Sequence, residues 1–116
     1  MTLEQCYAQA GGNLADAAVR LGGHEMVARF IRLFLKDDSF RQLQASFARQ
    51  DFTAAFRAAH TLTGVCRNLS LTRLGDAASA LTEALRGGAW DGSEALLEQV
   101  RRDYDDVYRA IAALDA

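Results

Sequence analysis

A histidine and a glycine in one helical segment are the residues of this chain best placed to do chemistry. The segment AHTLTG at positions 59–64 contains His60 and, one helical turn later, Gly64. Glycine inside a helix costs about 0.5–1 kcal/mol relative to alanine, so its presence here suggests that another group must approach His60 closely. An unperturbed imidazole is mostly neutral near neutral pH and has a nucleophilic ring nitrogen. The chemistry that fits is acceptance of a phosphoryl group.

The helix that must position His60 is predicted from about Asp51 to Leu69. At about 100° per residue, its apolar side chains fall along one side, which we expect to be buried. His60 and Gly64 lie on the polar flank, so His60 is expected to reach solvent. A lone histidine on a helix surface often has no role, and position alone leaves that interpretation open. The predicted buried face consists of Phe52, Ala55, Phe56, Ala59, Leu62, Cys66 and Leu69, and the polar flank also includes Thr53, Arg57 and Thr61.

Composition and periodicity predict an all-α fold, an antiparallel up-down four-helix bundle in which short N-terminal helices cover one end. The chain of 116 residues has no proline, is rich in alanine and leucine, and has the size of a single domain spanning residues 1–116. Glycine pairs punctuate the helical patterns. We expect short helices over 3–10 and 13–21, a long helix from His24 to Phe47 bent near Asp37, the His60 helix, a turn over 68–70, a helix over 71–86 and a last helix capped by Ser93. The predicted core includes Phe30, Phe34, Phe56, Leu62, Leu81, Val100 and Ile111, with Trp90 as a plug over one end.

Charge and cysteine usage exclude several classes of function. The 13 basic and 15 acidic residues are interspersed, with a net charge of −2, so there is no basic stripe for nucleic acid. The apolar runs are too short to span a membrane and the N-terminus lacks the pattern of a signal peptide, so we expect a cytoplasmic protein. Cys6 and Cys66 form neither a zinc signature nor a disulfide framework. Cys66 lies about 120° around the helix from His60, which disfavours a Cys-His nucleophile.

The AHTLTG segment, together with Asn68-Leu69 and the leucine-rich helix that follows, resembles the histidine-containing phosphotransfer (HPt) domains of multistep phosphorelays. The resemblance extends from about Gly23 to Leu114 in length and helix order, although the specific motif is only these few residues. It implies that His60 accepts a phosphoryl group from a receiver-domain aspartate and passes it to another receiver, with Gly64 leaving room for the phosphoryl group and the docked receiver. The resemblance also implies a monomeric phosphocarrier that is not a kinase with its own ATP site and has no metal or cofactor of its own. Its partners would be the receiver domains of response regulators or of a hybrid sensor kinase.

Two positions depart from the HPt pattern. Thr63 stands where a lysine is usual, and Ser70 stands where a glycine is common. The lysine would offer a cation to the phosphoryl oxygens, and Arg57 and Arg67 are the nearest substitutes in the sequence. Thr63 can still donate a hydroxyl hydrogen bond.

Other functions fit the sequence less well. A degenerate HPt-like interaction module, which docks on a receiver or another partner without phosphate turnover, is the alternative that the change at Thr63 suggests. A sensor-kinase dimerisation helix would have an acidic residue directly after the histidine and a proline shortly beyond, and neither is present. A hydrolytic or redox enzyme is disfavoured because the chain has no glycine-rich phosphate loop, serine elbow or helical metal motif.

Overall fold

The computed structural model describes residues 1–88 and 91–115, and over these residues the regular structure is entirely helical. This confirms the predicted all-α class. The expected plug at Trp90 lies outside the described residues. In chain order, the elements are α1 (Leu3–Ala10), α2 (Leu14–Leu21), α3 (His24–Leu33), a 3-10 turn (Phe34–Lys36), α4 (Ser39–Ala48), α5 (Phe52–Asn68), α6 (Thr72–Arg86) and α7 (Ser93–Ala112).

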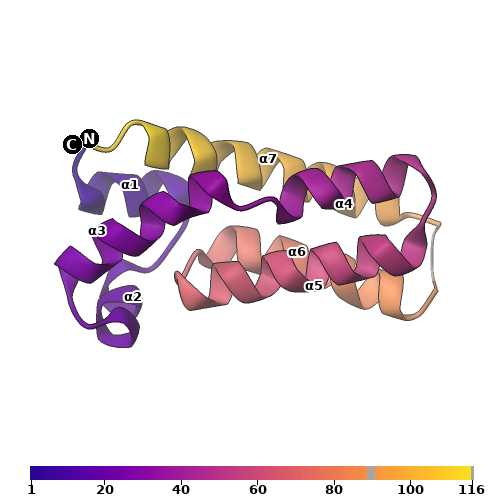
Figure 1. Cartoon of the computed structure of the whole chain (residues 1–116), viewed down its shortest axis with the longest axis horizontal. Helices are drawn as coiled ribbons and strands as arrows, with labels where there is room; N and C mark the ends of the chain where they lie inside the picture. The colour runs from indigo at the N-terminus through magenta and orange to yellow at the C-terminus, as the bar shows by residue number, and fades with distance from the viewer. Residues whose placement is uncertain (89–90, 116) are drawn as a thin grey trace.

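Helices α4 to α7 lie side by side as an antiparallel bundle, and α1 to α3 gather at one end of it (Figure 1). Helix α5 packs between α4 and α6, while α7 packs against α6 and α1. The molecule measures 40 × 23 × 19 Å, with the bundle along its longest axis. The predicted up-down bundle with short N-terminal helices over one end is therefore confirmed.

The single long helix predicted from His24 to Phe47 is wrong, because the chain leaves the helical conformation near Asp37. The helix tightens into the 3-10 turn, and Asp37 then adopts an extended conformation with φ −71° and ψ 134°. The Asp37 carboxylate accepts hydrogen bonds from the backbone N–H of Ser39, at 3.1 Å, and from the Ser39 hydroxyl. Aspartate and serine side chains compete in this way with helical backbone bonding, so the polar segment ends α3 and starts α4 instead of bending one helix.

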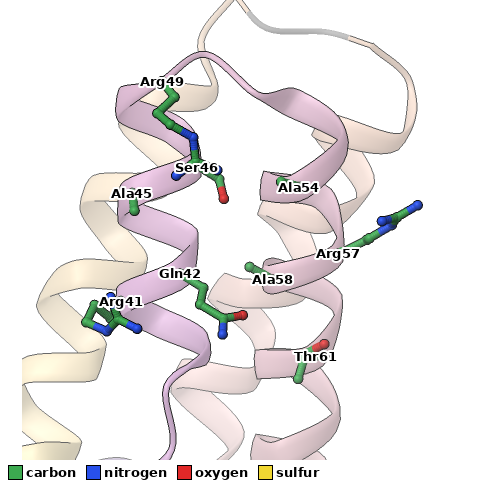
Figure 2. Close-up of a pocket in the computed structure, with 9 residues that line it drawn as sticks. All are labelled: Arg41, Gln42, Ala45, Ser46, Arg49, Ala54, Arg57, Ala58 and Thr61. Atoms are coloured by element: carbon green, nitrogen blue, oxygen red, sulfur yellow. The ribbon is translucent and has the colours of Figure 1, made fainter.

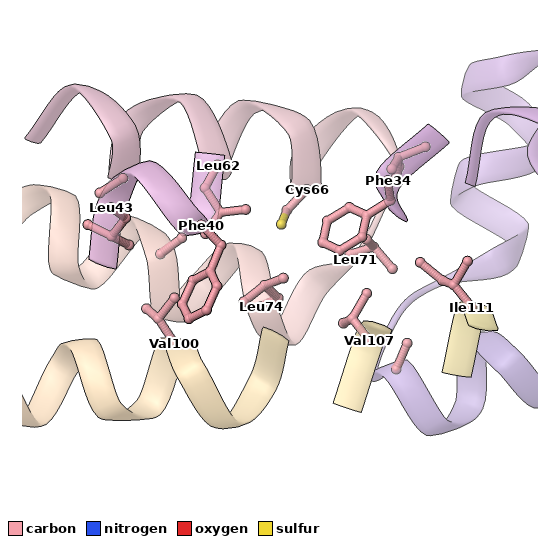
Figure 3. Close-up of a cluster of buried hydrophobic side chains, with 14 of the residues drawn as sticks. Phe34, Phe40, Leu43, Leu62, Cys66, Leu71, Leu74, Val100, Val107 and Ile111 are labelled. Carbon is pink, nitrogen blue, oxygen red and sulfur yellow. The ribbon is translucent and has the colours of Figure 1, made fainter. Parts of the chain in front are cut away.

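The core runs the length of the bundle and is built mainly from aliphatic side chains (Figure 3). Five of the predicted core residues are buried, namely Phe34, Leu62, Leu81, Val100 and Ile111, and Phe56 is half-buried against the core. Phe30 and Phe52 were assigned to buried faces and are instead 37% and 38% exposed. Phe30 lies about 60° around the helix from Val27 and about 100° from Ile31, so it falls at the edge of the buried stripe of α3. The buried side chains of α3 are Val27 and Ile31.

The predicted turn between α5 and α6 is present, and the N-terminal helices bind it. The Tyr7 hydroxyl donates a 2.8 Å hydrogen bond to the carbonyl oxygen of Leu69. The backbone N–H of Asn13 donates a 2.9 Å hydrogen bond to the carbonyl oxygen of Ser70. Ser70 has φ 54°, in the left-handed region that favours glycine. Its hydroxyl donates to the Asp16 carboxylate at 2.6 Å, and this bond lowers the pKa of Asp16. The departure from glycine at Ser70 is thus accompanied by a tertiary hydrogen bond.

Side-chain caps fix several helix boundaries. Asn13 and Asp51 cap α2 and α5, and each side chain accepts a hydrogen bond from the backbone N–H three residues later. The assignment of Ser93 as a cap was wrong. Gly92 occupies the cap position with φ 85°, and Ser93 is the first residue of α7, with a buried side chain. Glycine takes the cap because its backbone enters the left-handed region without steric cost.

We expect Gly12→Ala to lower the free energy of unfolding by about 1–3 kcal/mol, because the added methyl group would overpack the contact between α1 and the α5–α6 turn. A Cβ at this position would lie 2.7 Å from Cδ2 of Tyr7 and 2.9 Å from the carbonyl oxygen of Ser70. Urea denaturation monitored by circular dichroism measures the change. Gly87→Ala is the control, because the nearest atoms to its added Cβ, the carbonyl oxygens of Glu83 and Ala84, would lie 3.9 Å away. Equal stability of both variants and the parent would contradict the prediction.

Candidate functional site

Helix α5 carries the candidate site, and its sequence explains both its position and its exposure. The side chain of Asp51 accepts a 3.1 Å hydrogen bond from the N–H of Ala54 and starts the helix. Small residues at Ala55 and Ala59, both fully buried, allow α5 to pack closely between its neighbours. His60 follows directly and is exposed, near the middle of the helix. The predicted placement of the histidine on the polar flank therefore matches the structure.

Gly64 leaves open space one turn beyond His60. A Cβ built on Gly64 would have no neighbouring atom within 4 Å, its own helix backbone aside. The glycine is therefore not required by packing within this chain, in contrast to Gly75 on α6, where a Cβ would lie 3.2 Å from Cβ of Cys66. Glycine in a helix interior lowers the stability of the helix. The space above Gly64 is available to a group attached to His60 or to a docked partner.

The imidazole of His60 lies against an aromatic ring. The ring centres of Phe56 and His60 are 6.1 Å apart and their planes differ by 7°, so the two rings are stacked along the same face of α5. The guanidinium carbon of Arg86, at the end of α6, lies 4.9 Å from the centre of the Phe56 ring. Arg86 also lies 3.3 Å from the carboxylate of Glu83. Phe56 thus contacts both the histidine and a cation that the sequence interpretation did not include.

Thr63 lies on the α6 side of α5 rather than on its open face. Its hydroxyl donates a 2.8 Å hydrogen bond to the carbonyl oxygen of Ala59 and lies 3.4 Å from the hydroxyl of Thr82. Thr82 in turn donates to the carbonyl oxygen of Ala78 at 2.7 Å. Serine and threonine commonly bond to the preceding helical turn in this way. In this arrangement the Thr63 proton is already bound by the backbone of the residue before His60.

The two arginines proposed as substitutes for the missing lysine differ in what they contact. Arg67 donates a 2.9 Å hydrogen bond to the carboxylate of Asp76 on α6. Arg57 is exposed and forms no ion pair with any residue in the described ranges. Its side chain extends away from α4 (Figure 2). The structure therefore brings Arg57, Gly64 and His60 onto one open face, while Arg67 is paired across the α5–α6 interface.

Two other kinds of site were tested against the geometry. Burial raises the pKa of the Cys66 thiol to about 12, so this cysteine remains a protonated core residue at neutral pH. Among the described residues, no group of three or more His, Cys, Asp or Glu side chains is arranged to hold a metal ion. Within the same residues, no helix has the length and apolar content needed to cross a bilayer.

Arg86 and the stacking role of Phe56 were missed because they depend on how two helices meet. Phe56 was predicted as a core residue from its periodicity, and Arg86 lies far from His60 in the sequence. An antiparallel hairpin that turns near Ser70 brings the end of α6 beside the first half of α5. The short turn over residues 68–70, which requires that fold-back, was the signal available in the sequence.

Comparisons with known proteins identify the family of the chain. The sequence model of the Hpt domain family matches residues 25–110, which includes α4 to α6, nearly all of α3 and most of α7. No curated protein and no solved structure gave a match.

Proposed function

Because this chain belongs to the Hpt domain family, whose members act in histidine phosphotransfer within phosphorelay signalling, we propose that His60 is its phosphoacceptor. The observation that carries the proposal is an exposed imidazole in mid-helix, followed one turn later by a glycine with open space above it. His24, the other histidine, lies in the first turn of α3, with its ring nitrogen 3.9 Å from a carboxylate oxygen of Glu4. Of the two, His60 has the open surroundings that a docked receiver requires.

The proposed reaction needs few groups from this chain. A ring nitrogen of His60 attacks the phosphorus atom of an aspartyl phosphate on a receiver domain, in line with the bond that breaks. A P–N bond forms, the P–O bond to the aspartate breaks, and the carboxylate leaves with the electron pair. The N–H proton on the other ring nitrogen can then pass to water. Attack by a second receiver's aspartate on the phosphohistidine reverses these steps, so the chain acts as a carrier.

Arg86 joins Arg57 and Arg67 as a candidate to attract the phosphoryl oxygens. It contacts the Phe56 ring that stacks on His60, and release from its exposed pair with Glu83 would free it to turn toward a bound phosphoryl group. Exposed ion pairs contribute about 0–1 kcal/mol, so loss of any one of these cations should have a modest effect.

We expect Arg86→Ala to slow phosphotransfer about two- to fivefold, with smaller effects for Arg57→Ala and Arg67→Ala. Arg86 is favoured because its guanidinium already lies against the ring beside the imidazole. Single-turnover transfer from a phosphorylated receiver at saturating concentration measures the step. Arg20→Ala is the control, because Arg20 is an exposed arginine on α2 that is paired with Asp16. An equal loss of transfer rate in Arg20→Ala would show that the effect of Arg86→Ala is not local to His60.

Thr63→Lys is expected to transfer phosphate at least as fast as the parent protein. The lysine would add a cation one turn from the phosphoacceptor, and its long flexible stem can carry the charge out to solvent. The change also removes the bond from the Thr63 hydroxyl to Ala59, so thermal denaturation must show that the variant folds. A folded variant that transfers markedly more slowly would indicate that threonine serves a different purpose and would favour the interaction-module function.

The alternative function, an interaction module that docks without phosphate turnover, has one specific observation in its favour. The hydroxyl of Thr63 and the guanidinium of Arg67, two of the groups expected to assist a phosphoryl group, are engaged with the chain's own atoms. A module that only docks on a receiver has no use for either. Incubation with phosphorylated receivers separates the two functions. Phosphotransfer gives a label that is stable to base and labile to acid, as a phosphoramidate is, whereas an interaction module binds without becoming labelled.

A further inference from the structure

Charge is unevenly distributed over the helices. Helices α4 and α5 contain arginines and no aspartate or glutamate within their bounds, although the whole chain has a net charge of −2. Helix α7 contains more acidic than basic residues, and it packs against α6 and α1 rather than α5. The side of the bundle that carries His60 is therefore the more positive one.

A groove lies between α4 and α5 on this positive side (Figure 2). Its volume is about 360 Å³. Small residues from both helices, Ala45, Ala54 and Ala58, line it, and the Gln42 side chain extends across it toward α5. Thr61, which follows His60 directly, lines it as well. A protein that reaches the imidazole from the α4 side would therefore cover this groove.

The arginines around the groove are neutralised to different extents. Arg41 makes a close two-point contact with Asp38, in which its Nε donates to a carboxylate oxygen at 2.6 Å. Arg49 lies 3.8 Å from Asp51, whose carboxylate also caps α5. Arg57 forms no ion pair within the described residues. Arg49 and Arg57 are thus the two guanidinium groups with donors free for carboxylates of another molecule.

We propose that the receiver domain that exchanges phosphate with His60 covers the α4–α5 groove, and that its carboxylates bind Arg49 and Arg57 at the rim of the groove. The inference rests on the proposed function, because that function requires a partner that presents an anionic aspartyl phosphate at His60. Such a partner approaches the positive side of the bundle. There Arg57 forms no ion pair within the described residues, and Arg49 forms only a long one, at 3.8 Å from Asp51. The two arginines act mainly on affinity and approach, since charge complementarity acts mainly on association. The small assistance proposed above for Arg57 in the chemical step is a separate effect.

The test is a charge reversal with a matched control. A panel of purified receiver domains is phosphorylated with acetyl phosphate, and the receiver that labels the parent protein fastest is used as the probe. Arg49→Glu/Arg57→Glu is compared with Arg102→Glu/Arg109→Glu on α7. The control arginines are likewise exposed. Unlike Arg57, both are paired with carboxylates, Arg109 with Asp105 at 2.9 Å and Arg102 with Glu98 at 3.3 Å.

We expect the groove variant to lower the second-order transfer rate constant about tenfold at low salt, and the control to stay within about twofold of the parent. The loss should shrink as NaCl rises from about 50 mM to about 500 mM, because salt screens charges beyond the Debye length. The transfer rate at saturating receiver should fall no further than the small effect expected for the loss of Arg57 alone, about twofold or less. Equal losses in both variants, a loss insensitive to salt, or a loss at saturation as large as the loss in the second-order rate constant would overturn the inference.

Two further measurements keep this inference separate from the proposed function. In a His60→Gln background, which should accept no phosphate, calorimetry of receiver binding should still show weaker binding after the Arg49→Glu/Arg57→Glu change. Chemical labelling of His60 with phosphoramidate should differ by no more than about twofold between the parent and the groove variant, because it needs no receiver and loses only the small assistance from Arg57. Undiminished labelling of His60→Gln by the receiver would refute the proposed function. Self-association of the parent in sedimentation, abolished by either double variant, would instead assign the groove to the acidic side of a second copy and overturn the inference.

Discussion

His60→Gln is expected to reduce labelling by a phosphorylated receiver to background while the protein remains folded. The glutamine amide is polar and of similar reach but has no nucleophilic nitrogen lone pair, so no P–N bond can form. His60 is exposed, and its one described ring contact is with Phe56, so the substitution should change the free energy of unfolding by no more than about 0.5 kcal/mol. Transfer of radiolabel from the receiver measures the first effect, and thermal denaturation measures the second.

His24→Gln is the matched control for this prediction, because it removes the only other imidazole in the chain. It should be labelled like the parent. Labelling of the His60→Gln protein to the parent's extent, or loss of labelling in His24→Gln, would show that the phosphoacceptor has been assigned to the wrong residue.

Gly64→Gln should slow transfer by about 10- to 100-fold, since a displacement of about 1 Å between reacting groups can cost two orders of magnitude. The side chain would occupy the open space beyond His60, where a phosphoryl group and a docked receiver must fit. The same change should raise the free energy of unfolding by about 0.5–1 kcal/mol, because glutamine is a better helix former than glycine and nothing in the chain obstructs its Cβ. Loss of transfer with a gain in stability separates a steric effect from unfolding.

Gly64→Ala provides the graded comparison. A single methyl group should give most of the stabilisation with a much smaller effect on transfer, because it extends far less into the space above the helix. Transfer by a stable Gly64→Gln protein at the parent's rate would mean that the receiver does not use this space.

The features of the site that lie within one helix were predictable from the sequence. Helical periodicity determined which side of α5 is buried, and therefore that His60 and Gly64 lie on an open face. The same reasoning failed for Phe52, which lies in the first turn of α5 and is 38% exposed. Periodicity gives direction around a helix axis, but it does not say how far along the axis the neighbouring helices extend.

The features that the sequence did not predict depend on contacts between helices. Thr63 was expected to face the phosphoryl group, and its hydroxyl instead bonds to Ala59 beside Thr82 of α6. The pairing of Arg67 with Asp76 and the position of Arg86 over Phe56 likewise require the relative placement of α5 and α6. Residue types and spacing limit which groups can meet, but the rotation of one helix against another decides which of them do.

The attachment of the N-terminal helices to the α5–α6 turn bears on what part of the chain unfolds as a unit. Residues 1–24 lie outside the matched Hpt region, yet they supply Tyr7, Asn13 and Asp16 to the turn at Leu69 and Ser70. An excised fragment of residues 25–110 would leave these turn groups without their partners and would expose the face of α7 that α1 covers. Amide hydrogen exchange in the intact chain should therefore show the N-terminal helices and the hairpin that carries His60 opening in one cooperative step. The proposed phosphoacceptor would then belong to a cooperative unit larger than the region that the Hpt family model matches.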